Sequence, residues 1–139
     1  MFSFELKIPI SAPPSQVFAV LTEPAQITKW DMARWVQNDM RLTGKLRKRD
    51  DHDDLHEGEI VAYAPPYDFA YLWPVMKDPD EPEEGTFPVR FGFCVDASGD
   101  KSILTLTAHG FPTEDLAARE RNTWGGYFLE KLKKVAEQP

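Results

Sequence analysis

The sequence has one cysteine, no long apolar run and no excess of basic residues. The single cysteine, Cys94, has no partner for a disulfide within the chain, which agrees with a reducing compartment. No stretch approaches the roughly 18 apolar residues that cross a bilayer, and Met1 to Ile10 lacks the basic start and apolar run of a signal peptide. We therefore expect a cytoplasmic protein without a membrane span.

Positive charge is also scarce. The chain has 16 Lys and Arg against 23 Asp and Glu, a formal net charge of -7. Because such a chain repels a polyphosphate backbone, we expect no nucleic-acid partner. The basic cluster Lys45, Arg47, Lys48 and Arg49 is followed at once by an aspartate-rich run, and we interpret it as a solvated strand end.

Motifs for catalysis and metal binding are missing as well. The chain has no recognisable Ser-His-Asp triad, phosphate loop, dinucleotide fingerprint or EF-hand loop, so we predict no catalytic residue and no cofactor. His52 and His56 are four residues apart among aspartates, which superficially suggests a metal site. The segment reads as a hairpin loop, however, so this spacing does not put both imidazoles on one helix face, and no metal is predicted.

Alternating apolar and polar residues are abundant and predict six strands. In the fourth, the aromatic residues Tyr67, Phe69, Tyr71 and Trp73 share one face, and in the fifth an apolar face runs from Phe87 to Val95. The predicted strands cover residues 2–10, about 38–47, 55–64, 67–73, 87–95 and 102–109. Residues 31–37 receive no assignment, and the acidic, proline-rich residues 77–85 predict a surface loop.

Helical patterns occur after the first strand and at the end of the chain. Two short helices are expected between Pro13 and Pro24 and over 25–30, and a long amphipathic helix over 113–137, with a break at Gly125 and Gly126. Short connections favour antiparallel strands, and the last helix must bury its apolar stripe against the sheet. We thus predict one α+β domain over residues 1–139, large enough to contain a cavity.

Five segments carry a family resemblance. They are "IPISAPPSQVFAVLTEPAQITKW", the Gly44 segment, "YAPPYDFAYLW", "ILTLTAHGFP" and "WGGYFLEKLKK". Together they resemble the START-like superfamily, also called SRPBCC or Bet v 1-like, in its branch of activator of heat-shock protein ATPase homologues. The chain departs from that branch at Thr43, where a second glycine is common, and in the acidic loop around 78–84, which looks like an insertion.

The resemblance implies a helix-grip fold, in which a curved, roughly six-stranded antiparallel sheet wraps around the long C-terminal helix. It also implies a cavity between sheet and helix for apolar molecules. Members include carriers, cyclases, oxygenase subunits and co-chaperone domains, so the fold alone assigns no activity.

Aromatic side chains are the candidate ligand-binding residues. These side chains lie on strand faces and on the helix that faces them. They line a pocket if helix and sheet are separated by open space, and otherwise they fill a solid core. Two further tryptophans near the short helices form the pocket entrance or simply pack. The candidates are Trp30, Trp35, Phe69, Tyr71, Trp73, Phe91, Phe93, Trp124 and Phe128.

Three functions follow as hypotheses. The first is binding of a small hydrophobic molecule. The second is a cyclase- or hydrolase-like enzyme in the same pocket, which requires an inward ionisable group such as Glu59 or His109. The third is a chaperone-interacting domain, for which we expect a large apolar patch on the convex face of the sheet.

Overall fold

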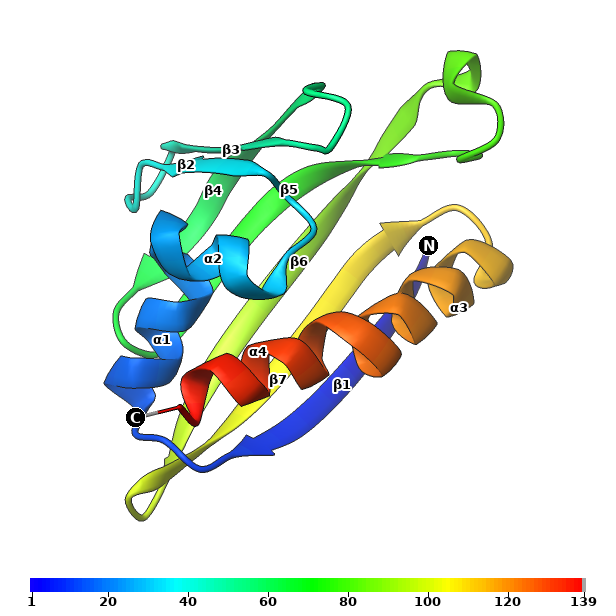
Figure 1. Cartoon of the computed structure of the whole chain (residues 1–139). Helices are drawn as coiled ribbons and strands as arrows, with labels where there is room; N and C mark the ends of the chain where they lie inside the picture. Colours follow the sequence, from blue (N-terminus) through cyan, green and yellow to red (C-terminus); the bar gives the residue numbers. More distant parts are fainter. Residues whose placement is uncertain (139) are drawn as a thin grey trace.

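Seven antiparallel strands form one sheet that curves around a long C-terminal helix (Figure 1). The computed structural model describes residues 1–138. The order across the sheet is β1-β7-β6-β5-β4-β3-β2. The strands are β1 (Phe2–Ile10), β2 (Trp35–Asn38), β3 (Lys45–Arg49), β4 (Leu55–Ala64), β5 (Asp68–Met76), β6 (Thr86–Ser98) and β7 (Lys101–Phe111). The helices are α1 (Pro14–Thr22), α2 (Pro24–Trp30), η1 (Pro82–Glu84), α3 (Glu114–Thr123), η2 (Trp124–Phe128) and α4 (Leu129–Ala136).

Period-two alternation produces the strands, as the sequence predicts. In β6, Phe87, Val89, Phe91, Phe93 and Val95 are all buried, while the residues between them are exposed or half-buried. The helices lie on the concave side of the sheet (Figure 1), and buried side chains of the strands and helices pack together in one core. The predicted α+β helix-grip fold is confirmed.

The predicted strand over residues 38–47 is confirmed at Asn38 and at residues 45–47 but is wrong between them. Residues 39–44 form a turn between β2 and β3, with Met40 and Thr43 at positive φ (54° and 65°) and Leu42 58% exposed. Short polar side chains close this turn, because Asn38 Oδ1 accepts from the Met40 amide at 3.0 Å and Asp39 Oδ2 from the Lys45 amide at 2.8 Å. The unassigned segment before it supplies β2, which raises the strand count from six to seven.

The C-terminal helix runs without interruption from α3 through η2 to α4. Thr113 caps its start, with Oγ1 accepting from the Leu116 amide at 3.2 Å. The two glycines expected to break the helix lie in η2, a turn of π-helix. At Gly125 the helix comes close to β1, because a Cβ built there would lie 3.5 Å from Leu6 Cδ1.

The two ends of this helix are attached differently. At the C-terminal end, Lys133 Nζ donates to the Pro9 carbonyl at 2.7 Å, and the Gln16 side chain donates to the Ala136 carbonyl. At α3, Arg119 Nη2 donates to the Met76 carbonyl at 3.1 Å. Side chains from α1, α2, α4 and the sheet pack solidly near the C-terminal end, so open space is left toward α3.

Candidate functional site

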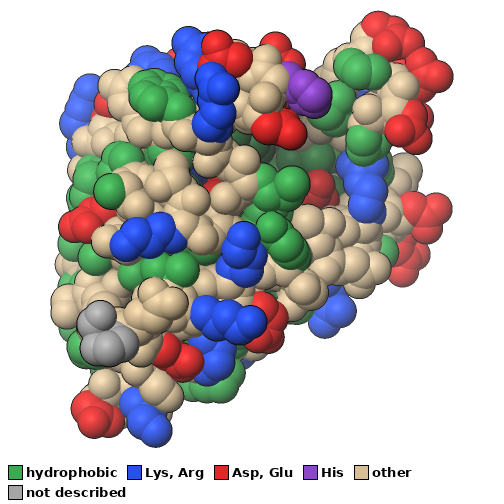
Figure 2. All heavy atoms as spheres, in the orientation of Figure 1, with side chains coloured by type: hydrophobic (Ala, Val, Ile, Leu, Met, Phe, Trp, Pro, Cys, Tyr) green, Lys and Arg blue, Asp and Glu red, His purple; other side chains and the backbone are tan. Residues whose placement is uncertain are grey.

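A cavity of about 500 Å³ lies between α3 with η2 and the β3 to β5 side of the sheet. In Figure 2 the surface is hollowed beside a histidine, between the body of the molecule and the acidic loop. The residues around the cavity are Asp31, Met32, Ala33, Lys48, Asp50, Asp51, His56, Tyr71, Trp73, Pro74, Val75, Met76, Pro79, Phe91, Arg119, Glu120, Thr123, Trp124 and Phe128.

Five of the nine candidate aromatic residues line this cavity. They come from β5, β6 and the helix, and their rings contact one another, with centroids 5.6 Å apart for Phe91 and Trp124 and 5.8 Å apart for Tyr71 and Trp73. The aromatic faces predicted for β5 and β6 therefore form one continuous wall. These five are Tyr71, Trp73, Phe91, Trp124 and Phe128.

The other four candidates do not line the cavity. Phe69 and Phe93 are buried in the core beside it. Trp30 packs behind the wall, 6.2 Å from the Trp124 ring, and donates to the Val20 carbonyl at 2.9 Å. Trp35 is 42% exposed on β2, with the Arg49 guanidinium 5.7 Å from its ring, so it does not form an entrance.

A buried ion pair lies on the sheet side of the cavity. Lys48 Nζ is 2.5 Å from Asp31 Oδ2, and each side chain is 12% exposed. The same ammonium lies over the Trp73 ring at 5.0 Å and the Tyr71 ring at 5.9 Å. Burial is the largest influence on the pKa of Lys48 and lowers it, but the charge of Asp31, the interaction with Tyr71 and the hydrogen bond to Asp31 together outweigh burial, so the pKa is raised. The interpretation of Lys48 as part of a solvated strand end is wrong.

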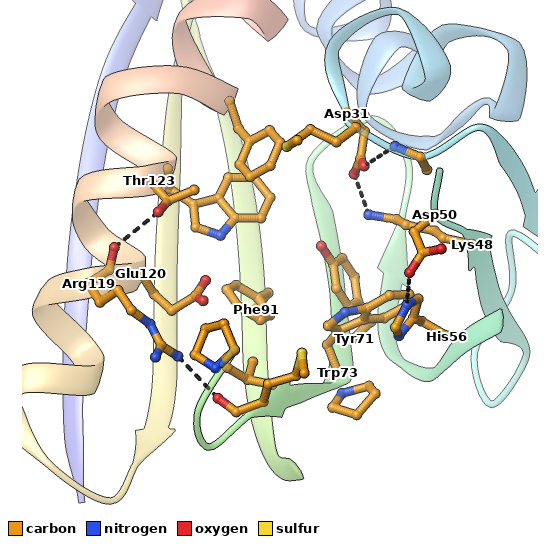
Figure 3. A pocket seen from close by; sticks show the side chains of 18 of the residues that line it. Asp31, Lys48, Asp50, His56, Tyr71, Trp73, Phe91, Arg119, Glu120 and Thr123 are labelled. Atoms are coloured by element: carbon orange, nitrogen blue, oxygen red, sulfur yellow. Dashed lines mark hydrogen bonds and ion pairs between the residues drawn. The ribbon is translucent and has the colours of Figure 1, made fainter. Parts of the chain in front are cut away.

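The Tyr71 hydroxyl faces the cavity. The residue as a whole is 3% exposed and its hydroxyl makes no hydrogen bond within residues 1–138, where no fully buried side-chain nitrogen or oxygen lacks a partner, so this oxygen lies at the accessible surface of the cavity. Figure 3 shows it pointing from β5 into the cavity. Burial raises the pKa of Tyr71 to about 12, so the phenol is a neutral donor and acceptor at physiological pH.

Glu120 faces the ion pair from the helix side. Its side chain points into the cavity near Phe91 (Figure 3). The neighbouring Arg119 is turned to the Met76 carbonyl. Burial raises the pKa of Glu120, and the attraction of Arg119 and hydrogen bonding from Trp124 offset this only in part.

The mouth of the cavity is acidic. His56 Nε2 and Asp50 Oδ2 are 2.9 Å apart at its edge, and this hydrogen bond is the main reason that the pKa of Asp50 is lowered. Pro79 brings the acidic loop of residues 77–85 to the rim. His52 is exposed and does not line the cavity. Among residues 1–138, no group of three or more His, Cys, Asp or Glu side chains is placed to hold a metal ion.

The ionisable residues singled out from the sequence do not face the cavity. Glu59 and His109 are exposed, and the residues beside them, Gly58, Ile60 and Ala108, are buried. The inward groups are Glu120 and Lys48. Helical spacing carries the signal for Glu120, which is four residues before Trp124 and eight before Phe128, and strand alternation carries it for Lys48, two residues after buried Leu46.

No helix among the described residues is both long enough and apolar enough to span a bilayer. A search of curated proteins finds no match to the chain.

Solved structures share the fold at low sequence identity. A protein from Mesorhizobium loti is 20% identical, with a TM-score of 0.79 and 96% of each chain covered. An HSP90 activator from Plasmodium falciparum is 21% identical, with a TM-score of 0.72, and the match covers 100% of this chain and 99% of that one. The Aha1 dimer from Colwellia psychrerythraea is 17% identical, with a TM-score of 0.76 and coverage of 99% and 97%. At these identities the likeness establishes the fold alone.

The family comparison agrees with the resemblance predicted from the sequence. The family model described as activator of Hsp90 ATPase homolog 1-like protein matches residues 11–137, nearly the whole chain. The chain therefore belongs to this family of the SRPBCC, or Bet v 1-like, superfamily.

Proposed function

We propose that the protein binds a small, mainly apolar molecule in the cavity between α3 with η2 and the sheet. The observation that carries this proposal is the Tyr71 hydroxyl, which lies at the accessible surface of an apolar cavity wall and makes no hydrogen bond to the described residues. A ligand that covered this hydroxyl without a hydrogen bond would lose about 1–3 kcal/mol. A ligand that offers Tyr71 a polar atom removes this cost.

Size and composition support the same function. A volume of about 500 Å³ lies within the range of small-molecule sites, which are mainly apolar and have a few convergent polar groups. Here the aromatic rings form the wall, and Tyr71, Glu120 and the Lys48–Asp31 pair are the polar groups (Figure 3).

Native mass spectrometry of the purified protein tests the proposal, followed by extraction and identification of any adduct. We expect a stoichiometric apolar adduct, or binding from a panel of aromatic and lipid molecules. Thr123→Phe places a bulky ring at the cavity from an exposed helix position and should reduce binding. Ala118→Phe makes a similar change on an exposed position of α3 that does not line the cavity, and should not. No binding by the unsubstituted protein would refute the proposal.

The same experiment separates binding from turnover. Recovery of the bound molecule with unchanged mass after long incubation supports a carrier. Recovery of a rearranged or hydrolysed product would favour the cyclase- or hydrolase-like hypothesis, with Glu120 as the inward ionisable group in place of Glu59 or His109.

A second candidate function is the activation of an Hsp90-type ATPase. It is favoured by the description of the family and by the HSP90 activator from Plasmodium falciparum among the similar structures. Arg90, Thr107 and His109 make the centre of the convex face polar. Within residues 1–138, the large exposed apolar side chains on that face are Leu72 of β5, Leu55 of β4 and Trp35 of β2. An ATPase assay of purified Hsp90 with and without this protein tests the candidate, and an unchanged rate at saturating protein would exclude it.

A further inference from the structure

Most charged groups around the cavity already have partners. Lys48 pairs with Asp31 at 2.5 Å, and Asp50 bonds to His56 at 2.9 Å. The guanidinium of Arg119 donates to the Met76 carbonyl. These contacts use the charges on the sheet side and at the edge, so they leave little to recognise a charged ligand.

Glu120 differs, because the effect of burial on its pKa is offset only in part by the charge of the neighbouring Arg119 and by hydrogen bonding from Trp124. In the part of the chain that the structure describes, its carboxylate forms no ion pair, yet it points into the cavity (Figure 3). A carboxylate in an apolar site gains most from a cation that brings its own charge and hydrogen-bond donors. The free charge inside the cavity is therefore negative.

Aromatic rings surround the same place. The Trp124 ring lies 5.6 Å from that of Phe91 and 4.9 Å from that of Phe128. Faces of tryptophan and phenylalanine attract cations that have left water. Lys48 already uses this attraction above Trp73 on the opposite wall.

The charges at the mouth of the cavity also favour a cationic ligand. Asp50 and Asp51 lie at the rim, and five acidic residues lie in the loop that Pro79 brings there: Asp78, Asp80, Glu81, Glu83 and Glu84. A negative mouth attracts cations and repels carboxylates such as fatty acids. Lys48 does not reverse this preference, because Asp31 neutralises it.

We propose that the ligand is an apolar, ring-containing molecule with one ammonium group, which Glu120 and the rings of Phe91 and Trp124 bind. This inference rests on the proposed binding function and adds the charge of the ligand to it. The hydrocarbon part lies against the aromatic wall, and the Tyr71 hydroxyl is left for a second polar atom.

Three probes of matched shape test the inference: 2-naphthylmethylamine, 2-naphthylmethanol and 2-naphthoate. Their affinities for the full chain at neutral pH are measured by calorimetry. We expect the amine to bind most tightly and the carboxylate most weakly. Glu120→Gln keeps the shape of the side chain and removes its charge, and should weaken amine binding about tenfold while leaving alcohol binding unchanged. Glu130→Gln, an exposed position on the same long helix, makes the same charge change away from the cavity and should alter neither.

The outcomes separate the two proposals. Equal or weaker binding of the amine than of the carboxylate, or an equal loss for amine and alcohol in Glu120→Gln, overturns the ammonium ligand and leaves the binding function standing. If no probe binds and the extraction experiment finds no adduct, both proposals fall together.

Discussion

Lys48 and Asp31 form an ion pair at 2.5 Å although their side chains are only 12% exposed. Lys48 lies in β3 and Asp31 directly follows α2, so the pair joins the outer strands to the short helices. A buried pair of this kind costs desolvation that its mutual attraction offsets only while both partners are present.

Removal of one partner should therefore destabilise the protein strongly. We expect Lys48→Met to lower the free energy of unfolding by about 3 kcal/mol, because Asp31 is left as a buried lone charge. The double variant Lys48→Met with Asp31→Leu should recover most of the loss. Urea unfolding measures both. Arg34→Met, which breaks an exposed pair with Asp53, should cost no more than about 1 kcal/mol, and an equal loss there would contradict the role of burial.

The buried phenol of Tyr71 should make the protein sensitive to alkali. Its pKa rises from 10.0 to about 12 on folding, so above pH 10 the unfolded chain loses a proton that the native state retains. Stability is then complete below pH 10 and falls by about 3 kcal/mol as the pH rises to 12. Lys48, whose pKa is also raised, acts in the same direction above pH 10.5.

Tyr71→Phe should remove most of this alkaline loss in unfolding experiments at several pH values. Tyr67→Phe, at a 52% exposed position, is the matched control and should retain the wild-type pH dependence. A slope in Tyr71→Phe as steep as that of the control would show that the phenol is not the source.

Glu120 should reduce stability at neutral pH. Its pKa is raised above 4.5 by burial, so the native state holds a proton that the unfolded chain gives up first. Its contribution is complete below pH 4.5 and is lost as the pH rises through the folded pKa. We therefore expect Glu120→Gln to be more stable than the unsubstituted protein at pH 7, with the difference disappearing near pH 4. Thermal unfolding at both values measures it, and a loss of stability at pH 7 would contradict an unpaired carboxylate.

Substitution by alanine should have opposite effects on stability at two glycines, Gly58 and Gly126. A Cβ at Gly58 would meet the Leu72 carbonyl and lie 2.7 Å from Trp73 Cε3, so Gly58→Ala should cost about 1–3 kcal/mol and displace a wall of the cavity. Gly126 is exposed and has no atom within 4 Å of its Cβ position. Gly126→Ala should add about 0.5–1 kcal/mol, because alanine restricts the unfolded chain. Chemical unfolding of both variants, with probe affinity for Gly58→Ala, tests this contrast.

Alternation and helical spacing were enough to predict most of the fold. The β6 and β7 strands and the long helix have long periodic patterns, so local sequence and burial agree. The sequence does not reveal the turn at residues 39–44, because Met40 and Thr43 adopt positive φ there. Residues other than glycine rarely have positive φ, so nothing in the sequence indicates it. Met40 and Leu42 alternate with polar residues there by coincidence and imitate a strand.

The candidate site was predicted only in its aromatic part. Rings at period two or four reveal a common face, which is how Tyr71, Phe91 and Trp124 were found. The Lys48–Asp31 contact joins segments that are distant in sequence, and local patterns do not encode such pairings. Trp35 lies exposed on β2 and away from the cavity, and exposed and buried tryptophans look alike in a short segment of sequence.

The two ends of the C-terminal helix differ in the number of side-chain hydrogen bonds that attach them to neighbouring elements. Near α4, Lys133 donates to the Pro9 carbonyl, and Gln16 of α1 donates to the Ala136 carbonyl of the helix. From the described part of α3, Arg119 alone makes a side-chain hydrogen bond to the sheet. If a ligand enters the cavity as proposed, we expect the hydrogen bond from Arg119 to the Met76 carbonyl to break first, while the hydrogen bonds at the opposite end of the helix remain. Arg119 and Glu120 are adjacent and both line the cavity, so the hydrogen bond that attaches α3 to the sheet lies beside the carboxylate proposed to bind the ligand.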